Sequence, residues 1–491
     1  MTDLEAGPPK SPARLSSMID GKPVGGTDSP VVVTDKYHHV PAFEVAAATR
    51  ADVDRAVHVA AKAVARPLAP HTRADILFGA AALLRERSRE FVAALVREAG
   101  KPYQASENEV GRAATTLQWS AEEAKRQHGE AFALGAEPRG EGRFGISVRK
   151  PIGVVAAITP FNSPLNLVTH KVGPALAAGN AVVLKPARRT PVCSLLLHDV
   201  LRDAGLPTGL CSVLVGPEVG DALLDNPLID AYTFTGSTAV GLELRKRVGL
   251  RPSLLELGGN SPVIVHADAD VALAAKACAS TGFSNAGQAC TAAQRVLVQR
   301  SIHDEFLERF IAEVEELVVG DPASPDTHVG PLISEAEAKR VETWIDEAVA
   351  QGATLIAGGP RDRALIPPAI VVNPPKDARV ICDEVFGPVV SVQSYEAIHD
   401  AFEAANDTPY GLHAAIFTDS LDIAWQAVLE IDAGGVLVNE GPQWRTEFVP
   451  FGGVKQSGIG REGPRYVTEE LSKLTLAMIR PSTPAAGKAA T

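Results

Sequence analysis

The sequence predicts an α/β protein of two domains, the first of them built on a doubly wound parallel sheet. The 491 residues exceed what one hydrophobic core usually holds. From residue 146 to 257, apolar segments of strand length alternate with helical segments, and a second alternating region covers 262–450. Short buried strands joined through helices form parallel sheets, whose ligands bind at the carboxyl ends of the strands.

The N-terminal part of the chain is expected to be helical after a short irregular start. Residues 1–17 are rich in proline and serine, which predicts disorder. Asp20-Gly21 predicts a hairpin turn. Thr49-Arg50-Ala51-Asp52 resembles a capping box with Asp at its fourth position. Helical spacing of apolar residues then covers 53–66, 70–99 and 104–128, before a glycine-rich stretch at 135–145.

The two alternating regions supply the sheets. In the first, strands are expected at 153–158, 181–184, 211–215, 231–234 and 254–257, with helices at 165–178, 191–204, 219–224 and 237–248. In the second, strands are expected at 263–265, 295–299, 354–357, 369–372, 389–392, 413–417 and 434–438, with helices near 270–280 and 303–317. A late strand at 474–479 precedes a tail, 481–491, that is rich in proline and alanine and is expected to be disordered.

Composition excludes several classes of protein. The net charge of −12 argues against a nucleic-acid-binding surface. Five scattered cysteines form neither a disulfide framework nor a zinc motif. No apolar run reaches about 18 residues, and the N-terminus lacks the features of a signal peptide, so we expect a cytoplasmic enzyme without a membrane anchor.

One cysteine lies in a context that suggests covalent chemistry. Cys290 follows Gly287-Gln288-Ala289, 34 positions after Glu256 in Leu255-Glu256-Leu257-Gly258-Gly259. A thiolate can attack a carbonyl carbon, and a carboxylate can later activate the water that releases the acyl group. If both side chains share a pocket, the sequence encodes a covalent catalyst. The alternative is a buried structural cysteine, which is the reading for Cys193, Cys211, Cys278 and Cys382.

Seven motifs in order give the chain a wider resemblance. They are Ile158-Thr159-Pro160-Phe161-Asn162-Ser163-Pro164, Leu184-Lys185-Pro186-Ala187, Phe234-Thr235-Gly236-Ser237, the Glu256 and Cys290 segments, Glu384-Val385-Phe386-Gly387-Pro388, and Pro450-Phe451-Gly452-Gly453-Val454-Lys455. Together they resemble the NAD(P)-dependent aldehyde dehydrogenase superfamily over nearly the whole length. The resemblance implies a Rossmann-like cofactor domain, a second α/β catalytic domain and a β-strand oligomerisation arm.

The resemblance implies specific catalytic roles. Cys290 would attack the aldehyde as a thiolate, its pKa lowered in a polar pocket. Glu256 would be the general base for hydrolysis of the thioester. Asn162 and the backbone N–H of Cys290 would bind the oxyanion. Lys171 and Glu462 match positions linked to proton relay, although each is equally compatible with a solvated surface charge.

The same resemblance implies a dinucleotide site. Lys185 would bind the adenine ribose, Glu384 would hold the nicotinamide ribose with Phe386 beside the ring, and Gly236-Ser237 would receive phosphate at a helix start. Arg188 stands where NAD-preferring relatives often have Glu, so NADP is expected to be tolerated or preferred, unless Arg188 is merely solvated. Further cofactor-binding candidates are Thr159, Pro160, Gly216, Phe234 and Leu257.

Two arginines are candidates for reading the substrate. The chain is most similar to the branch of lactaldehyde, non-phosphorylating glyceraldehyde-3-phosphate and phosphonoacetaldehyde dehydrogenases. Arg112 and Arg445 lie in regions where members that take anionic aldehydes carry arginines, and Phe161 and Trp444 would wall the tunnel. Ordinary salt bridges are the alternative for the arginines, and plain core packing for the aromatics. Ala289 replaces an arginine that some members place before the cysteine.

The resemblance also divides the chain and predicts its assembly. The cofactor-binding domain is expected to comprise 18–128 and 151–257, and the catalytic domain 258–455. Residues 129–150 and 456–480 would be oligomerisation elements of a homodimer or homotetramer. Two other classes stay open from the residues alone: a thiol-dependent ester hydrolase or acyl-transfer enzyme without redox chemistry, and a non-catalytic paralogue.

Overall fold

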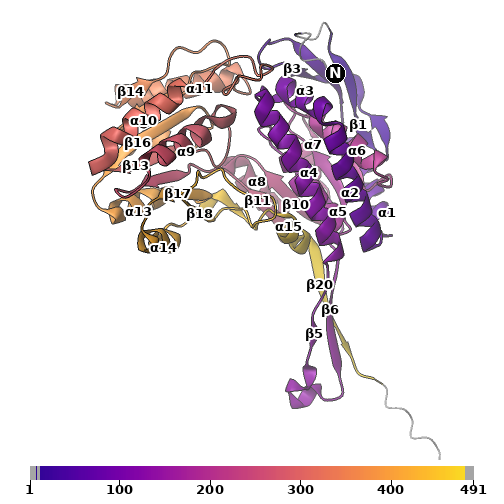
Figure 1. The fold of residues 1–491 in the computed structure, drawn as a ribbon. Coiled ribbons are helices and arrows are strands. Elements are labelled where there is room, and N and C mark those ends of the chain that lie inside the picture. Colours follow the sequence, from indigo (N-terminus) through magenta and orange to yellow (C-terminus); the bar gives the residue numbers. More distant parts are fainter. Residues whose placement is uncertain (1–6, 8–10, 482–491) are drawn as a thin grey trace, which may run out of the picture.

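Two α/β lobes and a thin projecting arm make up the protein in the computed structural model, which describes residue 7 and residues 11–481 (Figure 1). The first lobe contains a ten-stranded sheet, and its central strands β11, β10, β7, β8 and β9 run parallel. The predicted doubly wound parallel sheet is therefore confirmed. In sheet order the strands are β19 (Gly458–Ile459), β11 (Ser253–Glu256), β10 (Ala231–Thr235), β7 (Val154–Ile158), β8 (Ala181–Lys185), β9 (Cys211–Val213), β1 (Ala13–Ile19), β4 (Pro41–Ala47) and β3 (Gly26–Thr34), with β2 (Lys22–Val24) paired to β1.

The start of the chain differs from the prediction. Disorder over 1–17 needs correction from Ala13 onward, because β1 pairs in parallel with β4 through residues 13–16. This strand depends on distant partners, so its mixed serine and arginine content concealed it. The Asp20-Gly21 hairpin is confirmed, since β1 and β2 pair antiparallel around it. The rest of the predicted N-terminal disorder, apart from Gly7, Ser11 and Pro12, and the predicted tail from 482 onward lie outside the described residues.

Helices cover the first sheet and frame the site. The predicted helix over 70–99 is two helices, because the chain turns at Arg87. The capping box is confirmed: Thr49 Oγ1 accepts from the Asp52 N–H, and the Asp52 carboxylate accepts from the Thr49 N–H. The helices are α1 (Arg50–Val64), α2 (Pro70–Glu86), α3 (Ser88–Ala99), α4 (Tyr103–Lys125), α5 (Asn166–Ala177), α6 (Val192–Asp203), α7 (Val219–Asp225), α8 (Thr238–Val248) and α15 (Pro464–Glu470).

The second lobe holds a seven-stranded sheet. Its order is β14 (Thr354–Ala357), β15 (Ala369–Val372), β16 (Val389–Tyr395), β13 (Arg295–Gln299), β12 (Pro262–Val265), β17 (His413–Phe417) and β18 (Gly435–Val438), parallel except for β14. Its helices are α9 (Val271–Phe283), α10 (His303–Glu315), α11 (Glu335–Ala350), α12 (Arg379–Cys382), α13 (Ile398–Asn406) and α14 (Leu421–Glu430). Short 3-10 turns are η3 (Ser284–Gly287), η4 (Arg300–Ile302) and η5 (Lys455–Ser457).

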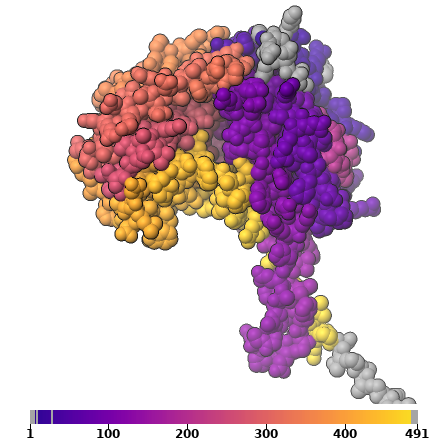
Figure 2. All heavy atoms as spheres, in the orientation of Figure 1, coloured from indigo at the N-terminus to yellow at the C-terminus, as the bar shows by residue number. Residues whose placement is uncertain are grey.

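The arm is an antiparallel sheet of β20 (Ser472–Ile479), β6 (Phe144–Pro151) and β5 (Ala131–Phe132), with 3-10 turns η1 (Leu134–Ala136) and η2 (Pro138–Gly140) at its tip. Figure 2 shows it standing clear of both lobes. The predicted element 456–480 is longer than the arm strand, because β19 pairs with β11 and α15 packs on α4 and α5. No helix in the described part of the chain is long and apolar enough to cross a membrane.

Candidate active site

The Cys290 segment begins with a strained turn. Asn285, Ala286 and Gly287 have φ values of 50°, 55° and 68° in succession. Such a conformation costs a non-glycine residue about 1–3 kcal/mol, so the surroundings must hold it. At Gly287 a side chain is excluded, because a Cβ would lie 2.0 Å from the Gly387 carbonyl oxygen. The turn therefore packs directly against the Glu384–Pro388 motif.

Asn162 is held against this turn by two reciprocal hydrogen bonds of side-chain amides. Its Nδ2 donates to the Gln288 carbonyl at 2.9 Å, and Asn285 Nδ2 donates to the Asn162 carbonyl at 3.1 Å. Within the described chain the Asn162 amide has this single acceptor, which leaves one of its two N–H groups for a ligand. Among the same residues, the backbone N–H of Cys290 also has no acceptor.

Glu256 is the last residue of β11 and is buried beside the cysteine. Gly259, three residues later, lies so close to Cys290 that a Cβ would stand 2.4 Å from the cysteine carbonyl oxygen. Glu256 Oε2 is buried, and no described residue hydrogen-bonds to it. Burial and the neighbouring Glu462 carboxylate raise the pKa of Glu256 well above its usual value. An unpaired carboxyl of this kind is suited to bind and deprotonate water.

Cys290 itself is partly exposed, and its thiol is protonated at neutral pH. Burial of the sulfur, followed by the Glu384 carboxylate, raises the pKa of Cys290 to about 12, although Arg445 opposes the shift. The expectation of a lowered pKa is therefore wrong for this form of the protein. Burial and the acidic neighbours both destabilise the thiolate, and the single cation Arg445 does not compensate for them.

Glu384 begins the Glu384–Pro388 motif, which packs against the turn of the Cys290 segment. Its Oε1 accepts from the Gly259 N–H at 3.0 Å, and burial raises its pKa to about 7. A Cβ on Gly258 would lie 2.5 Å from Oε2, so only glycine leaves space for this carboxylate. Phe386 has φ of 47°, and its ring meets that of Phe161 edge to face at 5.7 Å.

The remaining cofactor candidates follow the carboxyl edge of the first sheet. Lys185 ends β8, and burial, with help from Arg188, lowers its pKa. A Cβ on Gly241 would meet Leu257 at 2.3 Å, so α8 packs closely behind β11. Thr159, after β7, has a buried hydroxyl with no described partner. Pro160, Gly216, Phe234, Gly236, Ser237 and Leu257 lie in or directly after β7, β9, β10 and β11.

These residues fit a dinucleotide. Ser237 precedes α8 without capping it by its side chain, which leaves the N–H groups of that helix start available to phosphate. The paired carboxylate of Glu384 and the ammonium of Lys185 suit ribose hydroxyls. Arg188 is exposed just beyond Lys185, and its guanidinium forms no ion pair within the described chain.

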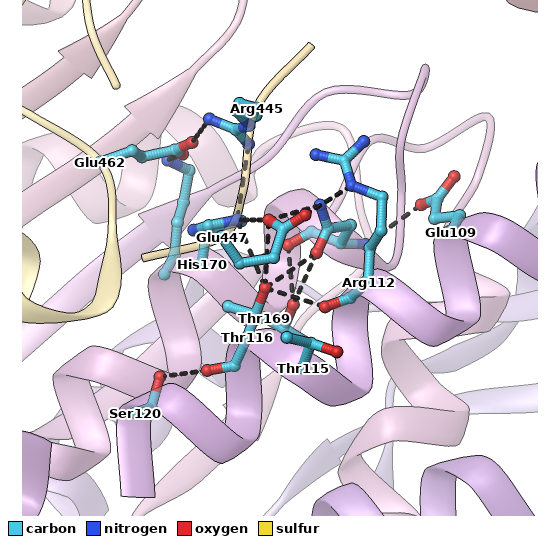
Figure 3. Close-up of polar contacts among 12 residues, drawn as sticks. Glu109, Arg112, Thr115, Thr116, Ser120, Thr169, His170, Arg445, Glu447 and Glu462 are labelled. Carbon is cyan, nitrogen blue, oxygen red and sulfur yellow. Dashed lines mark hydrogen bonds and ion pairs between the residues drawn. The ribbon is translucent and has the colours of Figure 1, made fainter. Parts of the chain in front are cut away.

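A cluster of charged side chains lies beside Glu256, and Figure 3 shows Glu462, Arg445, Glu447 and Arg112 of this cluster. Lys171 Nζ lies 3.2 Å from Glu462 Oε1, and Arg445 Nη1 lies 3.5 Å from Glu462 Oε2. Both Lys171 and Glu462 are buried, so the alternative of solvated surface charges is wrong for them. The Arg445 guanidinium also stacks 3.9 Å from the centre of the Phe451 ring.

Glu447 belongs to this cluster and was not singled out in the sequence. Its carboxylate contacts His170 Nε2 at 2.6 Å and Arg112 Nε at 2.5 Å. Arg445 Nη2 lies 3.4 Å from the same imidazole. His170 precedes Glu447 by 277 positions, so no local spacing connects them. In the sequence, the sign of a role for Glu447 was limited to its position two residues after Arg445.

The charges of this cluster do not balance. Burial alone would raise the pKa of Glu462, but neighbouring cations, Lys171 foremost, lower it to about 2. Hydrogen bonding to His170, with Arg112 nearby, likewise holds the pKa of Glu447 far below its usual value despite burial. Two carboxylates, Glu462 and Glu447, thus contact three cations, Lys171, Arg112 and Arg445. Among these contacts the cations outnumber the carboxylates by one.

Aromatic side chains of the predicted substrate site differ in their exposure. Trp444 is 58% exposed, so the alternative that it belongs to the core is wrong. Phe448 is also exposed, and its ring centre lies 5.0 Å from that of Trp119 on α4. Phe161 is half-buried. The structure thus brings Arg112 and Arg445 together around Glu447 and His170, whereas Phe161 packs against Phe386.

Comparisons with known proteins agree with this geometry. The model of the Aldehyde dehydrogenase family matches residues 24–476. The 3-sulfolactaldehyde dehydrogenase of Priestia aryabhattai is 47% identical over 443 residues, covering 90% of this chain and 93% of that protein. A lactaldehyde dehydrogenase of Methanococcus maripaludis is 36% identical over 469 residues, covering 94% and 99%. The NADP-dependent glyceraldehyde-3-phosphate dehydrogenase from Bacillus halodurans C-125, solved in complex with NADP, has a TM-score of 0.92 at 33% identity, covering 96% and 99%.

Proposed function

Because this chain belongs to the aldehyde dehydrogenase family, as an enzyme that uses NAD(P), we propose that it oxidises a short 2-hydroxyaldehyde with a singly charged anionic tail, of the 3-sulfolactaldehyde type. The observation that carries this proposal is the unbalanced positive charge of the cluster around Arg445. A buried excess of cations over carboxylates is unfavourable, so such a cluster favours an anion.

The charge count distinguishes among anions. A sulfonate or carboxylate carries one negative charge and balances one excess cation. A phosphate dianion would leave a negative charge beside Glu447 and Glu462, both of which are already ionised. The relatives named for sulfolactaldehyde and lactaldehyde share a three-carbon hydroxyaldehyde, which supports the same substrate length.

The chemistry follows from the residues beside the thiol. The Cys290 sulfur bonds to the aldehyde carbon, giving a thiohemiacetal whose oxyanion is held by Asn162 and the Cys290 N–H. A bound NAD(P)⁺ would supply the hydride acceptor, and loss of hydride from that carbon would leave a thioester on Cys290. Glu256 takes a proton from water, and the resulting hydroxide attacks the thioester. Aldehyde, NAD(P)⁺ and water thus give carboxylic acid, NAD(P)H and a proton.

Lys171 and Glu462 provide a route for the proton that Glu256 gains. Glu462 is near enough to raise the pKa of Glu256, and it is joined to Lys171 at 3.2 Å. Lys171 Nζ also donates to Thr233 Oγ1 at 3.4 Å. We assign this pair to proton transfer from Glu256 after each hydrolysis.

Arg445→Met tests the substrate assignment. We expect the kcat/KM for 3-sulfolactaldehyde to fall about 10- to 100-fold, because a hydrogen bond to a charged group is worth about 1.5–3 kcal/mol. Uncharged lactaldehyde should change far less, and Arg445→Lys should retain much of the sulfonate preference. The matched control is Arg465→Met, an exposed arginine paired with Glu469 at 3.0 Å. An unchanged ratio of sulfolactaldehyde to lactaldehyde kcat/KM in Arg445→Met would overturn the assignment.

Arg188 is assigned to the 2′-phosphate of NADP⁺. Arg188→Ala should lower kcat/KM for NADP⁺ about tenfold or more and leave the value for NAD⁺ nearly constant, since only NADP⁺ carries that phosphate. Arg245→Ala, an exposed change on α8, is the control. Steady-state kinetics with both cofactors measure the ratio, and a strong NAD⁺ preference in the unaltered protein would refute the assignment.

We propose that the arm joins two copies of the chain. β20 exposes Leu474, Leu476 and Met478 on one face, and Leu474 is 61% exposed. In the second lobe, β18 is a sheet edge, and the adjacent α14 exposes Leu421, Trp425 and Leu429. An apolar strand and an apolar sheet edge on one chain favour reciprocal strand addition in a two-fold dimer.

Charged substitutions on β20 test this assembly. Leu474→Glu combined with Leu476→Glu should shift the protein from dimers or tetramers to monomers in light scattering coupled to size exclusion, because two charges would be buried at the contact. Thr475→Glu, on the opposite face of the strand, is the matched control. A double variant that keeps the native mass would exclude the β20 face from the interface.

A further inference from the structure

The corner between α3 and α4 buries three charged side chains that the proposed chemistry does not use. Glu98, Lys101 and Glu109 are 0%, 5% and 4% exposed. Lys101 Nζ is paired with Glu109 Oε2. The corner itself is tight: Gly100 has φ of 69°, and a Cβ there would lie 2.8 Å from Pro331 of the second lobe. Burying such charges is unfavourable unless each has a specific partner.

Both glutamates bind backbone N–H groups at the starts of other helices than their own. Glu109 Oε1 accepts from the backbone N–H groups of Leu165 and Asn166 at 2.9 and 3.1 Å. Glu98 accepts from those of Val192 and Cys193 at 2.7 and 2.9 Å. The residues that precede α5 and α6 provide no side-chain cap of their own. Each carboxylate therefore satisfies N–H groups that the helix leaves open, where negative charge is favoured.

The two capped helix starts carry different halves of the site. α5 begins directly after the Asn162 loop, and Lys101 Nζ reaches Ser163 Oγ at 3.3 Å. α6 begins directly after the loop that carries Arg188. Lys36 Nζ donates to the Arg189 carbonyl of that loop at 3.3 Å, and Lys36 interacts electrostatically with Glu98. Each glutamate thus acts with a lysine that contacts the adjacent loop.

We propose that the α3–α4 corner positions both halves of the active site independently, with Glu109 fixing the oxyanion-binding Asn162 and Glu98 fixing the cofactor loop of Arg188. The inference rests on the proposed function for the roles of those two loops. Glu98 and Glu109 are positioning residues, since neither is placed to touch substrate. Their separation predicts two different kinetic defects from the same chemical change, Glu to Gln.

Glutamine is an informative substitution at both positions. Glu98 uses both carboxylate oxygens as acceptors, so Glu98→Gln places an amide donor against a backbone N–H. Glu109→Gln can keep Oε1 on the α5 start, but it turns an NH₂ group toward the Lys101 ammonium. In both variants the helix start loses an ionisable carboxyl group while the side-chain volume stays nearly constant.

The experiment compares the two variants with Glu107→Gln, an exposed glutamate of α4. For Glu98→Gln we expect the Kd of NADP⁺ and its KM to rise about tenfold and kcat to stay within about twofold. For Glu109→Gln we expect kcat for aldehyde oxidation to fall about 10- to 100-fold, with the Kd of NADP⁺ within about twofold. Calorimetric titration with NADP⁺ gives a readout that does not depend on turnover. The control should match the unaltered protein in every measurement.

Amide hydrogen exchange gives a second readout, independent of activity. Glu98→Gln should speed exchange at Val192 and Cys193 and not at Leu165 and Asn166, and Glu109→Gln should do the reverse. If both variants weaken NADP⁺ binding and kcat together, or loosen both helix starts, the corner is a general support and the proposal fails. If a Gln variant does not fold, the Asp variant at that position must show the same split. If the unaltered protein oxidises no aldehyde, the proposed function fails, while the exchange pattern still decides whether the two caps act separately.

Discussion

Cys290→Ala lowers kcat for aldehyde oxidation by about 10⁴-fold or more, the largest effect expected for a single substitution here. Alanine cannot form the covalent bond to the aldehyde carbon, so no hydride donor is generated. Absorbance of the reduced cofactor with excess aldehyde measures the loss. The fold should persist, because Cys290 is partly exposed in a loop held mainly by Asn162, Gln288 and Gly287.

Cys382→Ala is the matched control for the thiol. Cys382 is exposed at the end of α12, so the expectation of a buried structural cysteine is wrong for it, and its sulfur contacts the Lys376 carbonyl. This variant should retain nearly full activity. Substantial substrate-dependent reduction of cofactor by Cys290→Ala would contradict the covalent mechanism and would require direct hydride transfer from the hydrated aldehyde.

Glu256→Gln should stop the reaction after one turnover. The amide cannot take a proton from water, so thioester hydrolysis should slow by about 10²–10⁴-fold, the usual contribution of a general base. We expect a burst of up to one reduced cofactor per subunit, followed by a very slow steady state. Mass spectrometry of the quenched protein should show the acyl group on Cys290. Glu243→Gln, an exposed change on α8, should turn over normally.

The pH dependence of kcat/KM and of kcat distinguishes the role of Cys290 from that of Glu256. Because the pKa of Cys290 is raised to about 12, the thiolate fraction and hence kcat/KM should rise about tenfold per pH unit through neutrality. Glu256 also has a raised pKa, and it acts only when ionised, so a hydrolysis-limited kcat should also rise with pH. In Glu256→Gln the rise in kcat should disappear and the rise in kcat/KM should remain. A burst absent from Glu256→Gln, with normal turnover, would assign the base elsewhere.

Local sequence pattern was sufficient for the elements that surround the site. The strands from β7 to β11 and the helices between them were predicted within a few residues, because each is a short apolar segment ended by a turn residue. The family and the two-lobe fold are confirmed by the comparisons. The roles of Cys290, Glu256 and Asn162 stay predictions, although the structure brings their segments into contact.

The contacts that were not predicted depend on distant parts of the chain. β1 needs β4 and β9 as neighbours, and Glu447 needs His170. The pKa of Cys290 was expected in the wrong direction, since it depends on Glu384 and on burial, neither of which sequence spacing reveals. Glu98 and Glu109 looked like ordinary helix residues, and only the positions of α5 and α6 give them partners.

The reciprocal hydrogen bonds between Asn162 and the Asn285–Cys290 turn have a practical consequence for protein engineering. Asn162 belongs to the first lobe, whereas Asn285 and Gln288 belong to the second, so the oxyanion-binding group is shared across the lobe boundary. Chimeras that exchange whole lobes between related enzymes would take Asn162 from one parent and Asn285 and Gln288 from the other. A designer who recombines such enzymes should therefore inherit the Asn162 loop and the Asn285–Cys290 turn from the same parent.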